Sequence, residues 1–463
     1  MTAAIRKREP SRSRQAWANE INLGASEGER LAYEGGHPFG GETVHRWRFG
    51  NGLTVLLLVD ASAPIASYHT WFKVGSRHER PGKTGLAHLF EHLMFNETEN
   101  LRAGMFDRKL EENGAESNAA TWVDWTYYYE SLPAARIKLA VRLEAERMTR
   151  LVLREPQVAS EKEVVANERR FRVDDDVEGA ASELLYKTAF AQHPYGWPTI
   201  GWMEDIQGFS PDDCAAFYRT YYAPNNATVI VVGDVRERDL LLAIRAEYGS
   251  ISAQDIPPED IVPEPPQREA REVETRKPTA TEKLLLAYRG PALGDADHAT
   301  MTVLSEVLFG GRASRVYRAL VIEHEIATDV RGWVSSFRDP GLFECMATAR
   351  PGQTTGAIQA LMEQNFARVR AEVVDEEELA RAKARLELGL FQQLETIPGK
   401  AEQIGFFETV IGDPSYAFRR VEEFRRTTAS DVRRAARRYL ADESRTIVRV
   451  LPELGGASAG ATQ

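Results

Sequence analysis

Two distant segments of this chain share one pattern of residues. Residues 211–234 (PDDCAAFYRTYYAPNNATVIVVGD) align with residues 429–452 (ASDVRRAARRYLADESRTIVRVLP) at an offset of 218 positions. Asp213 then falls on Asp431, Tyr221 on Tyr439 and Thr228 on Thr446. Each segment has a helical pattern followed by a strand pattern. A repeat of this kind indicates that one supersecondary unit occurs twice.

The repeat favours an α+β fold made of two tandem homologous units. Each unit is expected to be a mostly antiparallel sheet with helices packed on one face. A segment with six prolines among many charges is typical of an extended linker between the units. The predicted organisation is a polar tail and lead-in over 1–40, a first domain over 41–252, the linker over 253–278, a second domain over 279–455 and a disordered tail over 456–463.

Turn signals and periodicity predict the main elements of the first unit. The Asn51-Gly52 pair between two apolar runs is a strong hairpin signal. The predicted strands are a hairpin over 43–60, a strand over 65–74 and two strands over 117–132. The predicted helices cover 134–152, 156–172 and 211–222, the second with Pro156 near its first turn.

A candidate metal site lies in the pentapeptide His88-Leu89-Phe90-Glu91-His92. Residues four apart share one face of a helix, so His88 and His92 can hold one metal ion. Glu91 lies beside them and can polarise a metal-bound water. This is the reverse of the HExxH order and is the inverzincin pattern. Thr84 is expected to cap the helix.

The alternative for this pentapeptide is a helix that carries two surface histidines and a solvated glutamate. Its apolar flanks argue against that reading, because a buried pair of imidazoles beside a carboxylate needs partners. An offset of 218 positions places the residues Glu306, Phe309 and Gly310 opposite His88, Glu91 and His92. The second unit is therefore expected to have no metal site.

A catalytic zinc site needs a third protein ligand and an open position for water. The segment EKEVVANE (161–168) offers three carboxylates, Glu161, Glu163 and Glu168. A ligand at Glu168 would leave Glu161 two turns away, where it could accept a hydrogen bond from a ligand imidazole. Spacing alone does not choose among the three, and a solvated acidic helix face is the alternative.

The chain resembles the pitrilysin family of zinc metallopeptidases, which includes insulysin and the mitochondrial processing peptidase. The resemblance covers roughly residues 43–455. It is carried by GLAHLFEH, GAESNAATWVDWTYYY (114–129), EKEVVANE, HPYGWPTIG (193–201) and YRTYYAPNNATVIVVGD (218–234). It implies one Zn²⁺ held by His88, His92 and Glu168, with Glu91 as the catalytic base and Glu161 as an outer acidic partner.

The resemblance also implies that residues 117–123 form a sheet edge that binds substrate. An extended peptide would add to this edge as a further strand, so main-chain hydrogen bonds would supply affinity. Asn118 and Ala119 would be the substrate-binding residues. The alternative is an ordinary edge strand rich in threonine and aromatic residues.

One expected feature of the family is missing from this sequence. Members supply an arginine and a tyrosine, seven residues apart, that stabilise the oxyanion, and such donors contribute about 3–4 kcal/mol each. Val321 and Thr328 occupy these positions here, while Arg315, Tyr317 and Arg318 nearby are expected on an ordinary helix face. The resemblance therefore implies a heterodimer with a homologous partner subunit that carries the pair, a homodimer being the alternative.

Charge and composition exclude several other classes. A net charge of −11, with no long basic run beyond the N-terminus, argues against a nucleic-acid partner. No apolar run is long enough to span a membrane, and no apolar segment follows the basic start as in a secretory signal. Two distant cysteines favour a reducing compartment. We expect a cytoplasmic protein with a disordered N-terminal tail, a transit peptide being the alternative.

The function expected from the sequence is that of a zinc-dependent endopeptidase. Its substrates would be short or unfolded peptides, and the chain would be the catalytic subunit of a two-chain assembly. The alternatives are a non-catalytic structural or assembly subunit of the same fold and a peptide-binding, chaperone-like subunit.

Overall fold

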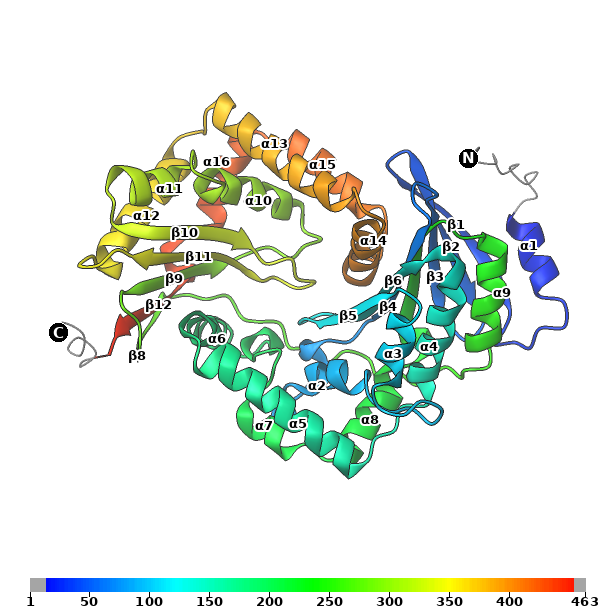
Figure 1. The fold of residues 1–463 in the computed structure, drawn as a ribbon. Helices are drawn as coiled ribbons and strands as arrows, with labels where there is room; N and C mark the ends of the chain where they lie inside the picture. The colour runs from blue at the N-terminus through cyan, green and yellow to red at the C-terminus, as the bar shows by residue number, and fades with distance from the viewer. Residues whose placement is uncertain (1–13, 454–463) are drawn as a thin grey trace, which may run out of the picture.

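The computed structural model describes residues 14–453 and has two lobes, each built on one sheet (Figure 1). The first sheet has seven strands and the second has five. The strands of the first sheet are β1 (Leu31–Phe39), β2 (Glu42–Phe49), β3 (Thr54–Val59), β4 (Ile65–Phe72), β5 (Glu116–Thr121), β6 (Thr126–Pro133) and β7 (Ala227–Gly233). Those of the second are β8 (Arg271–Lys277), β9 (Lys283–Arg289), β10 (Ala327–Val334), β11 (Leu342–Ala349) and β12 (Arg445–Pro452).

The helices follow the same division into two lobes. Those of the first are α1 (Arg14–Ile21), α2 (Leu86–Leu93), α3 (Met105–Glu111), α4 (Ile137–Thr149), α5 (Glu155–Arg169), α6 (Val177–Ala189), α7 (Met203–Gly208), α8 (Pro211–Tyr221) and α9 (Glu237–Tyr248). Those of the second are α10 (Ala296–Phe309), α11 (Arg315–Tyr317), α12 (Thr355–Ala371), α13 (Glu376–Gln393), α14 (Ile397–Ile411), α15 (Tyr416–Arg426) and α16 (Ala429–Tyr439). No helix within residues 14–453 is both long and apolar enough to cross a bilayer.

Both sheets have the same strand topology. Part of the first sheet runs β3-β7-β4-β6-β5, and the second sheet runs β8-β12-β9-β11-β10. In each, one pair is parallel (β3 with β7, β8 with β12) and the other pairs are antiparallel. The β1–β2 hairpin is an addition to the first sheet. The predicted α+β fold of two homologous, mostly antiparallel units is confirmed.

The aligned segments that predicted the repeat are built alike in detail. Helices α8 and α16 both begin with a capping box, formed by Ser210 with Asp213 and by Thr428 with Asp431. Each helix is followed by a single 3-10 turn and then by a central strand, β7 or β12. The helix-then-strand pattern therefore has the same structural role in both units.

The two units exchange helices, because one helix of each unit packs on the sheet of the other. Val55 and Leu57 of β3 pack in the core formed with the first unit's own helices, whereas Leu56 and Leu58 pack against Ile404 and other residues of α14. Conversely, α6 of the first unit packs on the second sheet (Figure 1). The repeat offset maps α6 onto residues 395–407, which lie largely in α14. Each sheet is thus covered by its own helices on one face and by the exchanged helix on the other.

Two predicted boundaries differ from the folded elements. The lead-in assigned to residues 1–40 contains α1 and the sheet strand β1, and the linker assigned to 253–278 contains β8. Both strands have sparse apolar patterns because they lie at sheet edges, where backbone pairing needs little side-chain burial. Residues 250–270 have no regular secondary structure. The predicted tails fall partly on residues 1–13 and 454–463, outside the described residues.

Candidate metal centre

Helix α2 carries the HLFEH motif with its apolar side facing the core. Leu89, Phe90 and Leu93 are fully buried, and His88 is 9% exposed. The predicted cap is wrong, because the hydroxyl of Thr84 donates to Asp205 Oδ2 at 2.6 Å and makes no cap bond to the helix. The residue before the helix is Gly85, with φ of 92° and no side chain.

Helix α5 brings Glu168 to the two histidines. Glu168 Oε2 lies 3.8 Å from His88 Nε2 and 3.3 Å from His92 Nε2. One ligand atom from each of the three residues lies within 4.8 Å of the others. His88, His92 and Glu168 are together called the metal cluster. Of the three carboxylates left open by spacing, the structure brings Glu168 into this cluster, whereas Glu163 is exposed.

The three residues fit a zinc ion. Burial lowers the pKa of His88 to about 4, so its imidazole is neutral and has a free lone pair at neutral pH. The buried His88 Nδ1 has no protein partner. The hydrogen bond from His92 lowers the pKa of Glu168, which keeps the carboxylate ionised. Two imidazoles and one carboxylate form a ligand set of catalytic zinc sites.

Glu161 lies beside the second histidine, on the same face of α5 as Glu168. Its Oε2 is 3.8 Å from His92 Nδ1, and its Oε1 accepts a hydrogen bond from Asn96 Nδ2 at 3.1 Å. The 3.8 Å separation is longer than a hydrogen bond. Glu161 is therefore oriented toward the outer nitrogen of His92 by Asn96.

Glu91 is partly buried next to His92 on α2. Burial raises the pKa of Glu91 above its usual value. A carboxyl whose pKa is raised toward neutrality is suited to take up and release a proton. This environment fits a general base.

The predicted substrate edge is an edge in the structure. Strand β5 pairs only with β6 among the described strands and lies at the end of the first sheet. Asn118 and Ala119 lie in its middle, and Asn118 Oδ1 accepts a hydrogen bond from the Ala119 N–H at 2.8 Å. The unpaired side of β5 is available for an added strand.

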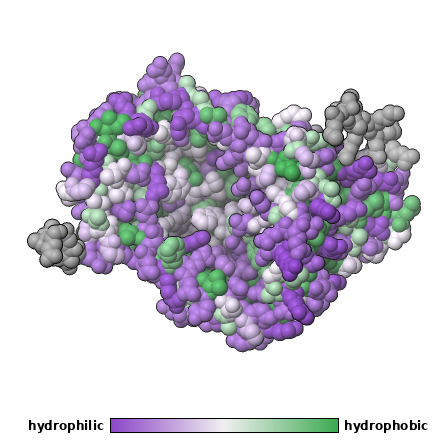
Figure 2. Space-filling model, viewed as in Figure 1, coloured by the Kyte–Doolittle hydropathy of each residue, from purple (hydrophilic) through white to green (hydrophobic). Residues whose placement is uncertain are grey.

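A cavity of about 420 Å³ adjoins the metal cluster, in the hollow between the lobes (Figure 2). Its lining includes His88, Glu168 and a set of large apolar and aromatic side chains, Trp122, Val123, Tyr186, Tyr195, Ile200 and Phe337. Phe337 comes from the second unit, and no local sequence signal could have found it. Arg172 also lines the cavity and pairs with Glu168 Oε1 at 2.9 Å. Residues four apart are neighbours on a helix surface, so the sequence could have predicted this ion pair.

The residues at the family's arginine and tyrosine positions lie away from this cavity. Val321 packs against the core of the second unit, and the Thr328 hydroxyl donates to the carbonyl of Thr348. Neither residue lines the cavity beside the metal cluster. Nearby, Arg315 is paired with Glu378 and Arg318 with Glu323, as expected for helix faces.

Comparison with known families gives two adjoining matches. Residues 54–201 match the family described as Insulinase (Peptidase family M16), and residues 208–386 match the Peptidase M16 inactive domain. The first match contains all the residues of the metal cluster, and the second begins within the first lobe and extends to α13.

Individual relatives cover most of the chain. A zinc protease, PqqE, of Helicobacter pylori is 30% identical over 408 residues, which are 87% of this chain and 91% of the relative. The probable mitochondrial-processing peptidase subunit beta of Arabidopsis thaliana is 24% identical over 87% of this chain and 77% of the relative. The crystal structure of a Helicobacter pylori protease has a TM-score of 0.86 at 30% identity and covers 89% of this chain and 100% of that chain. This chain belongs to the M16 family of insulinase-like peptidases.

Proposed function

We propose that this protein is a zinc-dependent endopeptidase that cleaves short or unfolded peptides. The observation that carries the proposal is the convergence of His88, His92 and Glu168, with Glu91 beside them on the same helix. The relatives named as zinc proteases support the choice of metal. The first domain would carry the chemistry, and the second would complete the cavity.

The chain's own residues would share the catalytic work. Bound zinc would polarise the scissile carbonyl and lower the pKa of a water molecule. Glu91 would take the proton from that water and pass it to the leaving amine. Glu161 would orient His92, and the edge of β5 at Asn118 and Ala119 would hold the peptide as an added strand.

The proposal includes a homologous partner subunit. Val321 and Thr328 cannot donate to an oxyanion as an arginine and a tyrosine would, so a second chain would supply those donors. Two relatives are named as subunits of the mitochondrial processing peptidase, which supports a two-chain assembly. A homodimer is the alternative arrangement.

A non-catalytic assembly or peptide-binding subunit is the second candidate function. The observation that favours it is the absence of the arginine and tyrosine from residues 321 and 328. The complete set of His88, Glu91, His92 and Glu168 argues against it, because a purely structural subunit has no need of a metal cluster. A peptide-binding subunit would retain peptide affinity in a Glu91 variant.

Cleavage of a quenched unfolded peptide by the zinc-loaded chain, assayed in its active assembly with the partner subunit, tests the main proposal. Glu91→Gln should lower cleavage by about 10²–10⁴-fold, because the proton acceptor is lost, while zinc content stays the same. Removal of zinc with a chelator should abolish cleavage, and added zinc should restore it. Near-normal turnover in the variant would refute the role of Glu91.

The same assay, combined with light scattering, tests the partner. We expect zinc-bound but inactive protein until a homologous chain with the arginine and tyrosine is added. A fully active monomer or homodimer would refute the need for such a partner. Bound zinc without cleavage in any assembly would support the non-catalytic candidate.

A further inference from the structure

The start of the zinc helix α2 has no capping side chain of its own. Gly85 has positive φ, and a Cβ there would lie 2.4 Å from the Ile200 carbonyl oxygen, so no other residue fits. The neighbouring Thr84 is bound to Asp205 instead. The first N–H groups of a helix need acceptors, and an uncapped buried start is costly. Something outside the helix must therefore provide them.

Glu79 provides these acceptors from outside the helix. Its Oε2 accepts from the Gly85 N–H at 2.8 Å, and its Oε1 accepts from the Ala87 N–H at 2.7 Å. Both carboxylate oxygens are thus used on the first turn, and Ala87 directly precedes the ligand His88. One side chain thus supplies acceptors for two of the N–H groups that a helix start leaves without intrahelical partners.

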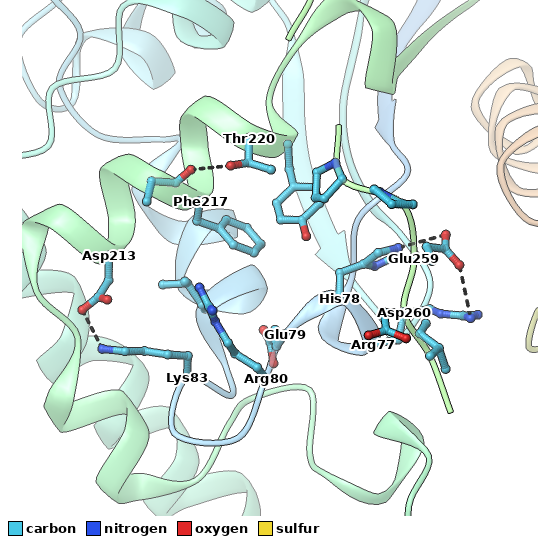
Figure 3. Close-up of a pocket in the computed structure, with 16 residues that line it drawn as sticks. Arg77, His78, Glu79, Arg80, Lys83, Asp213, Phe217, Thr220, Glu259 and Asp260 are labelled. Atoms are coloured by element: carbon cyan, nitrogen blue, oxygen red, sulfur yellow. Dashed lines mark hydrogen bonds and ion pairs between the residues drawn. The ribbon is translucent and has the colours of Figure 1, made fainter. Parts of the chain in front are cut away.

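Glu79 is itself held in place, away from the metal cluster. Its own N–H donates to the Ser76 carbonyl at the end of a 3-10 turn. Its side chain lines a cavity of about 470 Å³, where it lies beside Arg80 (Figure 3). This cavity contains none of the three ligand residues of the metal cluster. Glu79 is therefore not a ligand of a metal held by these three residues. It can affect that metal only by positioning helix α2.

We infer that Glu79 is a positioning residue for His88. It holds the first turn of α2, through its bonds to the Gly85 and Ala87 N–H groups, so that His88 faces Glu168 before metal binds. This inference rests on the proposed metal role of His88. Residues that orient a ligand change metal affinity by about 10–100-fold when they are replaced.

Glu79→Gln tests the inference, because its amide keeps the shape but can accept from only one of the two N–H groups. Zinc dissociation constants are measured by chelator competition on the full chain, and the Co²⁺-substituted protein is followed by visible absorption. We expect zinc binding to weaken about tenfold and the Co²⁺ spectrum to change. Hydrogen exchange of residues 86–90 in the metal-free protein should accelerate.

A matched control lies in the second unit. Glu282 Oε2 accepts from the backbone N–H of Thr355 at 2.7 Å and from its hydroxyl at 2.8 Å, at the start of α12. Glu282→Ala removes this acceptor at a helix start far from the metal cluster, whereas Glu282→Gln would keep an oxygen able to accept both bonds. The alanine substitution should lower the melting temperature but leave zinc affinity and the Co²⁺ spectrum unchanged. An equal loss of zinc affinity in this control would overturn the inference.

Glu79→Asp is a second variant in case the glutamine variant does not fold. It keeps both carboxyl oxygens but is one methylene shorter, so zinc affinity should fall between those of the wild type and a tenfold loss. Zinc affinity equal to the wild type in a folded Glu79 variant, with unchanged exchange at 86–90, would overturn the inference. Zinc binding by the wild type without peptide cleavage in any assembly would instead defeat only the proposed function.

Discussion

At the residue scale, a buried carboxyl in the second unit predicts how stability depends on pH. Glu344 is 4% exposed and accepts hydrogen bonds from Tyr186, Trp333 and Ser335. Burial raises its pKa from 4.5 to about 7. Between these values the folded protein holds a proton that the unfolded chain has released. The stabilisation is therefore complete below about pH 4.5 and is lost as the pH rises through about 7.

Glu344→Gln should remove this pH dependence. The neutral amide keeps an acceptor oxygen for its neighbours, and no charge has to be buried at high pH. At pH 8 we expect the variant to be more stable than the wild type by on the order of 1–3 kcal/mol, with a smaller difference at pH 5. Urea unfolding at the two pH values measures this. Identical pH slopes for the variant and the wild type would contradict the prediction.

At the element scale, the exchanged helix α14 depends on one close contact with the first sheet. A Cβ at Gly405 would lie 2.1 Å from Trp71 Nε1, which is part of a rigid buried ring. Glycine is normally unfavourable inside a helix by about 1 kcal/mol relative to alanine. Here it allows α14 to approach β4, so packing outweighs helix propensity.

Gly405→Ala should therefore destabilise the protein although it improves helix propensity. We expect a loss of about 1–3 kcal/mol from overpacking, measured by thermal or urea unfolding. Gly389 in α13 is the matched control, because a Cβ there meets nothing within 4 Å. Gly389→Ala should stabilise the protein by up to about 1 kcal/mol. Equal effects of the two substitutions would show that Trp71 does not limit the approach.

At the scale of the whole molecule, one buried arginine joins the two units. Arg77 is 3% exposed and pairs with Asp124 of the first unit at 2.8 Å. It also pairs with Asp339 of the second unit at 2.6 Å and with Glu259 of the connecting segment at 3.5 Å. Asp124 in turn accepts from the backbone N–H of Arg338, in the loop that carries Phe337. The cavity beside the metal cluster thus depends on how the units are joined.

Arg77→Met should loosen this joint. Removing one partner of a buried ion pair costs about 3–5 kcal/mol, because the remaining carboxylate is left without its counter-charge. Urea unfolding measures the loss, and limited proteolysis should cut residues 250–270 faster than in the wild type. Arg108→Met is the control, since its pair with Glu112 is exposed and should contribute below about 1 kcal/mol. A loss of unfolding free energy no larger than that of Arg108→Met would show that Arg77 does not hold the two units together.

Prediction from the sequence was most accurate where the signal was local. The Asn51-Gly52 turn, the strands of the hairpin and the helix of the HLFEH motif follow from neighbouring residues alone. The spacing of His88 and His92 already determines that they share a face. The cap at Thr84 was wrong because Asp205, distant in the sequence, competes for its hydroxyl. Local chemistry cannot decide between a local and a distant acceptor.

The repeat in the sequence determined the kind of fold, and the motif determined two of the three candidate metal ligands. Periodicity sets which residues of a helix or strand are apolar, so both units and the histidine pair could be predicted without a structure. Spacing left Glu168 open among three carboxylates, and the family resemblance implied it. The reach of Glu79, the exchange of α6 and α14 and the place of Phe337 were decided by the tertiary structure. Each of these depends on contacts between segments far apart in the chain, and the pattern within a segment does not specify which partner buries it.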